Sequence, residues 1–209
     1  NNTLNKIKEK RNFYFRGNSN KNDGVFSEIS SGIDVLQDVV NKKAVDILDF
    51  EANVGDGVFV LSNVEYKKNL FSEAELKIIK PYYTTTQLHR YYGEKANSHW
   101  IIYTESDINN RIDNYPNIKK HLGKYKKIIT SVYAPYGLHR AREQRFFEGE
   151  KIFALRKCSC RPTFTYTNFS CYVSRAFLVI KTNRINQKYL TGLLNSKLVV
   201  FWLKNKGKM

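Results

Sequence analysis

Residues 138–181, LHRAREQRFFEGEKIFALRKCSCRPTFTYTNFSCYVSRAFLVIK, carry the features that decide the fold and chemistry of this chain. Arg140, Arg142 and Arg145 open the stretch, and their spacing predicts a short helix over residues 138–147. The residues that follow predict strands near 152–157 and 172–181, and a turn at 167–168 makes the region between them resemble a hairpin.

The second feature of this stretch is a change in charge. Glu150 is the last acidic residue, and the 59 residues after it hold twelve of the 35 Lys and Arg side chains. The first 150 residues hold 23 basic and 19 acidic side chains, so most of the net charge of +16 lies in the C-terminal part. A folded surface without carboxylates predicts contact with nucleic acid or another anionic partner.

Composition bounds the remaining classes. A chain of 209 residues that is 42% hydrophobic can form one substantial domain with a real core. The longest apolar run, residues 198–203, is far too short to cross a bilayer. Three cysteines do not make a disulfide framework, so we expect a reduced, cytoplasmic setting. Because the chain starts with Asn1 and stops after an apolar run, we also expect it to be a piece of a longer protein.

Other segments predict helices mixed with strands. Residues 57–62 and 99–104 have strand signatures, and Ser72 with Glu75 forms a capping box for a helix that stops at Lys80. Pro116 is suited to begin a helix that reaches residue 129, and Asn186 to cap one that reaches about residue 204. Since no βαβ rhythm is present, the predicted class is α+β. Residues 1–24 are predicted to be a basic arm or linker, and residues 25–209 a single domain.

The order of these landmarks resembles the TaqI-like C-terminal specificity domain, and the last helix also resembles the recognition domains of Type I specificity subunits. The matching pieces are SSGIDV (30–35), GDGVFVLSNVE (55–65), SEAELKIIKPYY (72–83), HWIIYT (99–104), YPNIKKHL (115–122), FFEGEKI (146–152), the Tyr-Val pair at 172–173 and INQKYLTGLLNSKLVVFW (185–202).

This resemblance implies an α+β domain with mixed or antiparallel sheets, flanking helices and a C-terminal helix. It implies sequence-specific recognition of double-stranded DNA in a bacterial restriction–modification enzyme of type II, fused to an adenine-N6 methyltransferase, an endonuclease or both. The chain departs from such parent enzymes in one respect: Pro81-Tyr82-Tyr83 is not their Asn/Asp-Pro-Pro-Tyr/Phe motif, and no glycine-rich cofactor loop is present. Hence S-adenosylmethionine and magnesium are expected of the parent, and no cofactor of this piece.

DNA contacts are predicted from charge and hydrogen-bonding capacity. Guanidinium groups bind phosphate or a guanine edge through two donors, whereas lysines act as point charges. The residues predicted to contact DNA are Gln87, Arg90, Tyr91, Lys120, Lys124, Lys127, Arg140, Arg142, Arg145, Arg156, Lys157 and Arg161. Strand alternation places Arg156 and Lys157 on opposite faces. The alternative for these side chains is structural: glutamates 143, 148 and 150 pair with the arginines, the Tyr91-Tyr92 pair is core, and the lysines form a solvated helix face.

Two chemical alternatives compete with recognition. Asp56, Glu65 and Lys67 have the residue types of a metal-dependent nuclease, although a Gly-Asp-Gly turn also explains Asp56. Cys158, Cys160 and Cys171 lack the spacing of zinc knuckles, so no metal site is expected. A third possibility is a module that binds RNA or docks a protein. The apolar face of the last helix is expected to be an interdomain surface.

Overall fold

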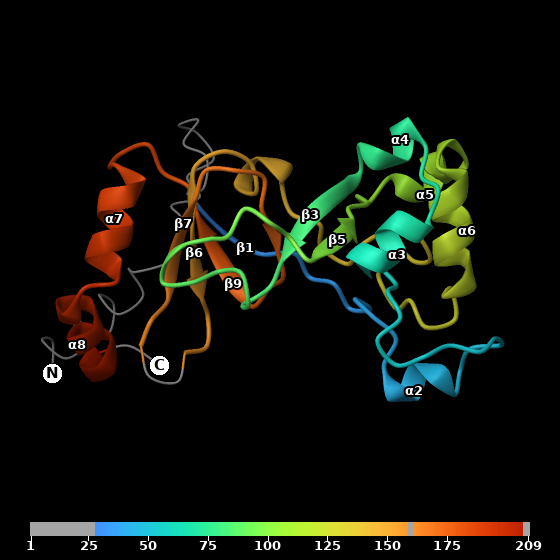
Figure 1. Ribbon diagram of the computed structural model, residues 1–209, viewed down its shortest axis with the longest axis horizontal. Coiled ribbons are helices and arrows are strands. Elements are labelled where there is room, and N and C mark those ends of the chain that lie inside the picture. Colours follow the sequence, from blue (N-terminus) through green and yellow to red (C-terminus); the bar gives the residue numbers. More distant parts are fainter. Residues whose placement is uncertain (1–27, 159–160, 207–209) are drawn as a thin grey trace, which may run out of the picture.

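Two β-sheets form the framework of the chain, in a computed structural model that describes residues 28–158 and 161–206. Figure 1 shows one sheet at one end of the molecule with helices α7 and α8, and the other sheet at the opposite end with helices α3 to α6. The basic arm predicted over residues 1–24 lies outside the described residues.

The first sheet has five strands, with β6 in its centre. Its strands, in spatial order, are β1 (Ile29–Ser31), β9 (Phe177–Ile180), β6 (Lys151–Leu155), β7 (Phe164–Thr167) and β4 (Tyr91–Tyr92). Strand β6 runs antiparallel to both β9 and β7, and β4 lies parallel to β7 at the edge. The predicted strands near 152–157 and 172–181 therefore do pair, through Ile152 opposite Ile180.

The second sheet has four strands. They are, in spatial order, β2 (Val60–Ser62), β5 (His99–Ile102), β3 (Ile79–Tyr83) and β8 (Tyr172–Val173). Strand β5 runs antiparallel to β2 and β3, whereas the short β8 runs parallel to β3. Pro81 lies opposite Trp100 of β5, and the pairing with β8 begins only at Tyr82. The proline thus occupies a part of the strand that has one neighbour, where its missing N–H is tolerated.

The sheets exchange strands, and this makes them one folding unit. Strand β4 follows β3 in the chain and precedes β5, yet it belongs to the five-stranded sheet. Conversely, β8 lies between β7 and β9 in the chain and joins the four-stranded sheet. Because neither sheet consists of a continuous stretch of chain, the two cannot be separated at a single cut. The mixture of antiparallel and parallel pairs with flanking helices confirms the predicted α+β class.

Most helices are short, and several begin with a side-chain cap. They are α2 (Lys42–Val45), α3 (Asn63–Lys68), α4 (Glu73–Leu76), α5 (Ile108–Arg111), α6 (Pro116–Lys124), α7 (Gln187–Leu194) and α8 (Lys197–Lys206), with 3-10 turns η1 (Ile112–Asn114) and η2 (Gln144–Phe146). The predicted capping box of Ser72 and Glu75 is present. Glu75 also accepts backbone N–H bonds at the start of α6, from Asn117 at 2.7 Å and Ile118 at 3.0 Å. One buried carboxylate therefore joins two helices.

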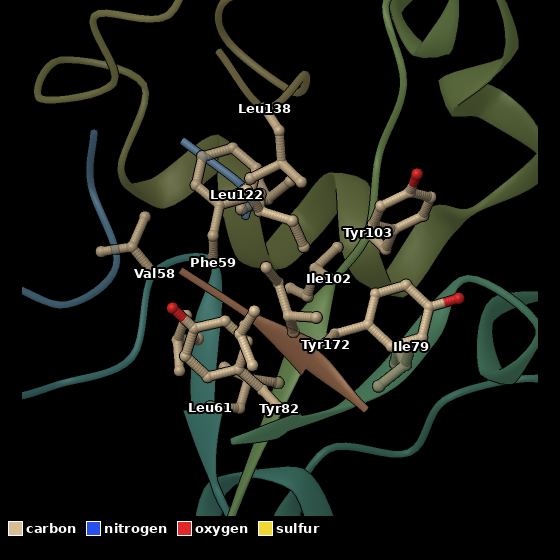
Figure 2. Packing of buried hydrophobic residues seen from close by; sticks show 14 of the residues in the cluster. Val58, Phe59, Leu61, Ile79, Tyr82, Ile102, Tyr103, Leu122, Leu138 and Tyr172 are labelled. Carbon is tan, nitrogen blue, oxygen red and sulfur yellow. The ribbon is translucent and has the colours of Figure 1, made fainter. Parts of the chain in front are cut away.

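Strand β6 is buried on both faces. Ile152 and Ala154 pack against Phe164 of β7 and against Leu190 and Leu194 of α7. The alternate side chains of β6 face the main core, which the four-stranded sheet dominates. Figure 2 shows this core, in which Leu61, Ile102 and Tyr172 come from three different strands. They pack together with Phe59, which directly precedes β2. Among the described residues, no helix is both long and apolar enough to pass through a membrane.

Several predicted boundaries are wrong. The helix from Pro116 ends at Lys124 instead of residue 129, and the helix after Ser72 ends at Leu76 because Ile79 already belongs to β3. The last helix is interrupted after Leu194 and resumes at Lys197. The predicted hairpin is also incorrect, because β7 follows β6 directly in the chain and the 167–168 turn leads into β8.

The helix predicted over residues 138–147 is absent. Arg140 forms an isolated bridge with Asp34, Arg142 has a φ of 68°, and only the 3-10 turn η2 follows. Leu138, Phe146 and Phe147 are almost fully buried, at 1%, 2% and 0% exposure. A regular helix is replaced by an extended path that inserts these three apolar side chains into the core. The shared helix face of Arg142 and Arg145 therefore does not exist.

Candidate nucleic-acid interface

Residues 32–34 hold two arginine-bearing segments together. The backbone N–H of Ile33 donates to Val173 O at 2.9 Å, and the N–H of Arg175 donates back to Ile33 O at 2.8 Å. On the other side, the N–H of Asp34 donates to Arg140 O at 3.0 Å, and the N–H of Arg140 donates back to Asp34 O at 3.3 Å. The short segment of residues 32–34 is therefore a clasp between the chain near 140 and the turn near 175.

A glycine is required for this close approach. A Cβ atom on Gly32 would lie 2.1 Å from Ser174 O and 2.8 Å from Val173 O. Both atoms belong to the backbone, so neither can move aside as a flexible side chain would. Close packing thus requires glycine at position 32, and Ile33 and Asp34 supply the backbone hydrogen bonds of the clasp.

The clasp also places a carboxylate among guanidinium groups. The Asp34 side chain is 13% exposed, and its Oδ1 lies 3.2 Å from Nη1 of Arg175. The pKa of Arg142 lies below its ordinary value, because burial and the neighbouring Arg140 both lower it. Asp34 opposes this shift in part. Arg142 and Arg175 therefore lie in the field of the Asp34 carboxylate, and Arg140 bonds to its backbone.

Next to the clasp lies an open cleft of about 730 Å³ at the junction of the two sheets. It is lined by Ile33, Val35, Asp38, Tyr82, Leu155, Arg156, Lys157, Ser174, Arg175 and Ala176. Strand β6 ends at Leu155, so the alternation expected for Arg156 and Lys157 does not extend to them, and both exposed side chains line the same cleft. Arg156 is anchored by a 3.4 Å bond from Nη1 to Arg175 O.

A second hollow of about 430 Å³ has Arg140 in its lining. It is lined by Glu105, Ser106, Asp107, Tyr133, Leu138, His139, Arg140, Ala141 and Arg142. Arg142 is held there by its backbone, because Tyr103 donates its hydroxyl proton to Arg142 O. Arg140 and Arg142 thus line this hollow, whereas Arg156 and Lys157 line the cleft, and these four side chains around the clasp are called the basic surface below.

Arg145 and Arg161 line neither of these two hollows. The Nε of Arg145 donates to Glu143 at 2.6 Å, and its guanidinium lies 4.3 Å from the centre of the Phe146 ring. For Arg145, the structure therefore shows the structural alternative, in which a nearby glutamate pairs with the arginine. Arg161 is exposed in the β6–β7 connection, next to residues 159–160, which lie outside the described residues.

Gln87, Arg90 and Tyr91 lie on the excursion from β3 to β5 that supplies β4. Gln87 is 7% exposed, and its amide group is used within that excursion by Thr84 and Ser98. Arg90 donates to the backbone carbonyl of Asn195 at the end of α7, and it lies 5.1 Å from the ring centre of Tyr91. Tyr91 is 50% exposed at the sheet edge, so it is not core.

The predicted lysines lie on and just after α6. Lys120 and Lys124 are exposed on the helix, whereas Lys127 lies beyond its end and forms an ion pair of 2.5 Å with Asp49. Figure 1 shows α6 at the end of the molecule opposite α7 and α8. These lysines therefore form a separate group from the arginines at the clasp.

The nuclease residues have structural partners. Glu65 accepts from Gly57 N at 2.6 Å and from Ser62 N at 2.8 Å, which completes the capping box of α3. Burial raises the pKa of Glu65, but these hydrogen bonds outweigh it and leave the pKa below its ordinary value. Asp56 accepts from Asn53 N at 2.8 Å within its own turn. In the part of the chain that the structure describes, no three His, Cys, Asp or Glu side chains gather as metal ligands; Cys160 lies outside it.

Comparison with known proteins now adds the family. The family model described as the TaqI-like C-terminal specificity domain matches residues 80–208, which is more than half of the chain. The chain belongs to this family. The match begins at the second residue of β3, extends past α8 and includes every residue predicted to contact DNA, whereas the clasp at residues 32–34 precedes it.

A solved structure supports the fold over a longer range. The Type IIL restriction–modification enzyme MmeI, determined in complex with DNA, resembles the chain with a TM-score of 0.56 and 13% sequence identity. The similarity covers 85% of this chain and 22% of the MmeI chain, so the chain spans a small part of that enzyme's length. No curated protein matches the sequence.

Sequence reasoning on this specificity domain missed Asp34 and Arg175. Arg175 contributed only to the charge of the acid-free C-terminal part, and no contact was predicted for Asp34. The available signal was SSGIDV, residues 30–35, a landmark of the family resemblance. The role of Asp34 in this segment depends on Arg175, which lies 141 positions later in the chain, and a local sequence pattern does not show such a contact.

Proposed function

We propose that this specificity domain recognises a particular sequence of double-stranded DNA for a restriction–modification enzyme. The observation that carries the proposal is the basic surface around the clasp, in a domain whose family is described by specificity. Arg156 and Lys157 line the cleft on one side of the clasp, and Arg140 and Arg142 line the second hollow. Clustered guanidinium groups at a cleft are suited to DNA, because they bind both phosphates and base edges.

The proposed mechanism has two layers. Arg140, Arg142, Arg156, Lys157 and Arg161 meet the duplex at and beside the cleft, and the exposed Lys120 and Lys124 neutralise phosphates without reading sequence. Arg90 and Tyr91 contribute from the edge strand β4. Gln87, Arg145 and Lys127 act indirectly, because their polar groups already hold the surrounding chain in place.

The chemistry of the parent is a further part of the proposal. We place residues 25–209 in one recognition domain of a longer chain, with residues 1–24 as an arm. An adenine methyltransferase or endonuclease part of the same chain would use S-adenosylmethionine and magnesium. Such a methyltransferase must turn its target adenine out of the stack, so a recognition domain that fixes the register of the duplex supplies what that step needs. The restriction–modification enzyme MmeI, solved with DNA, supports this arrangement by its similar fold.

The test begins with selection of duplexes by the purified 209-residue chain from a randomised library. We expect enrichment of one sequence and tighter binding to it than to a scrambled duplex of equal length. Incubation of the selected duplex with magnesium should leave it intact, because the nuclease alternative requires Glu65, whose oxygens are occupied by the α3 cap. Structured RNA should compete poorly. Cleavage, preference for RNA or failure to enrich any sequence would each contradict the proposal.

A further inference from the structure

We propose that Asp34 and Arg175 form a specificity-determining pair, in which Arg175 contacts a guanine edge and Asp34 positions it. This inference rests on the proposed function. Arg175 is not among the residues predicted to contact DNA, and here it contacts a base. Asp34 is acidic, and here it orients the Arg175 side chain.

Arg175 is fixed at its backbone and free at its tip. It lies in the turn between β8 and β9, and its N–H donates to Ile33 O at 2.8 Å while its carbonyl accepts from Arg156. The side chain is 66% exposed at the rim of the cleft. An exposed side chain on an anchored turn is a suitable base reader, since little backbone freedom is lost on binding.

The contact with Asp34 leaves a complete donor fork. Both Asp34 oxygens approach the same nitrogen, Nη1 of Arg175, at 3.2 Å and 3.4 Å. Within residues 28–158 and 161–206, no hydrogen bond engages Nε or Nη2. These two donors are parallel and adjacent, which is the geometry that binds O6 and N7 of guanine in the major groove.

The charge of Asp34 favours a base over a phosphate. A guanidinium next to a carboxylate attracts a phosphate less strongly than an unpaired one does, because the acid repels the same phosphate. The side chain of Asp34 is 13% exposed and its backbone bonds to Arg140 on one side, so the carboxylate cannot easily turn away. Asp34 thus reduces affinity for the sequence-independent backbone while it fixes the direction of the fork.

The experiment compares two duplexes: the one that the wild-type chain selects from a randomised library, and a scrambled version of it. Affinities of Arg175→Ala, Arg175→Lys, Asp34→Asn and the Asp34→Asn/Arg175→Ala double variant are measured for both. Asp38→Asn is the matched control, because Asp38 lines the same cleft but its carboxylate accepts from the neighbouring Val39 N–H at 2.9 Å.

We expect Asp34→Asn to bind the selected duplex more weakly and the scrambled duplex equally or more tightly. The ratio of the two affinities should fall about tenfold or more, as for loss of one bidentate contact. Arg175→Ala and Arg175→Lys should lower the ratio similarly, at one G·C pair of the site, and the double variant should add little. Asp38→Asn removes the same charge and should leave the ratio unchanged.

Three results overturn the inference. One is an unchanged ratio in Arg175→Ala, which decides the matter even if Asp34→Asn does not fold. Another is weaker binding of Asp34→Asn to both duplexes with a lower melting temperature, because that identifies a purely structural residue. The third is additive loss in the double variant. If the wild-type chain selects no sequence at all, the proposed function itself has failed, which is a distinct outcome.

Discussion

Lys151 is a cation enclosed where the two sheets meet. It is fully buried, and its Nζ donates to Gly149 O at 2.8 Å and to Phe169 O at 2.6 Å. Burial lowers the pKa of Lys151 to about 8, in part opposed by the nearby Glu148. The ammonium therefore links the chain before β6 to the chain before β8 at an electrostatic cost.

This cost predicts a dependence of stability on pH. An unfolded lysine keeps its proton up to about pH 10.4, so between about pH 8 and 10 the unfolded state binds more protons and stability rises with pH. Burial raises the pKa of Cys171, so this thiol opposes the rise once unfolded thiols ionise near about pH 8.5. Buried tyrosines such as Tyr82, whose pKa is raised to about 12, oppose it further once unfolded tyrosines ionise near pH 10. Up to about pH 9.5, Lys151 should add about 1–2 kcal/mol to the free energy of unfolding.

Urea denaturation of the wild type and Lys151→Met at about pH 7, 8, 9 and 9.5 measures this dependence. The variant should be less stable at neutral pH, because two carbonyls lose their donor. The difference in stability between the wild type and the variant should nevertheless grow above pH 8, because only the wild type has the Lys151 contribution. Parallel pH curves for the two proteins would show that Lys151 does not titrate in this range.

Gly32 makes a second prediction at this scale. Gly32→Ala should lower the free energy of unfolding by about 1–3 kcal/mol or more, because the new Cβ would lie 2.1 Å from a backbone oxygen. Denaturant unfolding measures the change, with Gly123→Ala in α6 as the control. No atom lies within 4 Å of a Cβ at Gly123, so that substitution should be neutral or stabilising by up to about 1 kcal/mol. If Gly32→Ala were as stable as the wild type, the clasp would not require glycine at this position.

At the scale of elements, strands with strong local patterns were predictable and segments shaped by distant contacts were not. HWIIYT gave a strand prediction that β5 confirms, and the Ser72–Glu75 capping box is present as predicted. Residues 164–167, FTYT, form β7, and their threonines and aromatics were a signal of a strand that a hairpin interpretation overlooked. The 138–147 segment had helical spacing, but burial of Leu138 and Phe147 and the pairing of Arg140 with Asp34 override it.

The candidate site was predictable only in its composition. The basic side chains were identified from charge, yet Arg156 and Lys157 share a cleft because β6 ends at Leu155, and a strand end is poorly defined by sequence. Gln87 has the chemistry of a base reader, but burial directs its amide into the chain. Burial and partners, which decide between these roles, come from the folded arrangement.

The interruption between α7 and α8 is a structural joint. Asn195 is fully buried; its amide Nδ2 donates to Phe164 O at 2.7 Å, and its Oδ1 accepts from Phe164 N at 3.2 Å. Its own backbone carbonyl accepts from Arg90. The Asn195 side chain thus bonds to both backbone groups of Phe164, as the backbone of a neighbouring strand would. Because these bonds fix Asn195 against β7, the helix ends here.

Asn195→Ala should therefore destabilise the domain by about 2–5 kcal/mol, because two buried backbone groups of Phe164 lose their partners. Thermal and urea unfolding measure the effect. Asn205→Ala is the control, since that exposed side chain donates only to Phe201 O of its own helix at 2.7 Å. A loss below about 0.5 kcal/mol for Asn195→Ala would contradict the joint.

At the scale of the whole molecule, the exchanged strands explain how one basic surface is assembled. In the chain, Arg140 lies between β5 of the four-stranded sheet and β6 of the five-stranded sheet, and Arg156 directly follows β6. Arg175 lies between β8 and β9, which belong to different sheets. Their proximity is a consequence of the exchange. The acid-free C-terminal part adds charge around it, so the whole surface should attract DNA in a salt-dependent way.

This attraction predicts the dependence of DNA affinity on salt. If about five or six phosphates are neutralised, the logarithm of affinity against the logarithm of salt concentration should have a slope near −5. Arg142→Ala and Lys120→Gln should each reduce the slope by about 1, since each removes one phosphate contact in the proposed mechanism. Lys119→Gln is the matched control, because its ammonium lies 2.6 Å from Asp113 and is already neutralised. Fluorescence anisotropy with a scrambled duplex over a range of salt concentrations measures all four slopes, and a wild-type slope near zero would contradict the basic surface as the site of DNA binding.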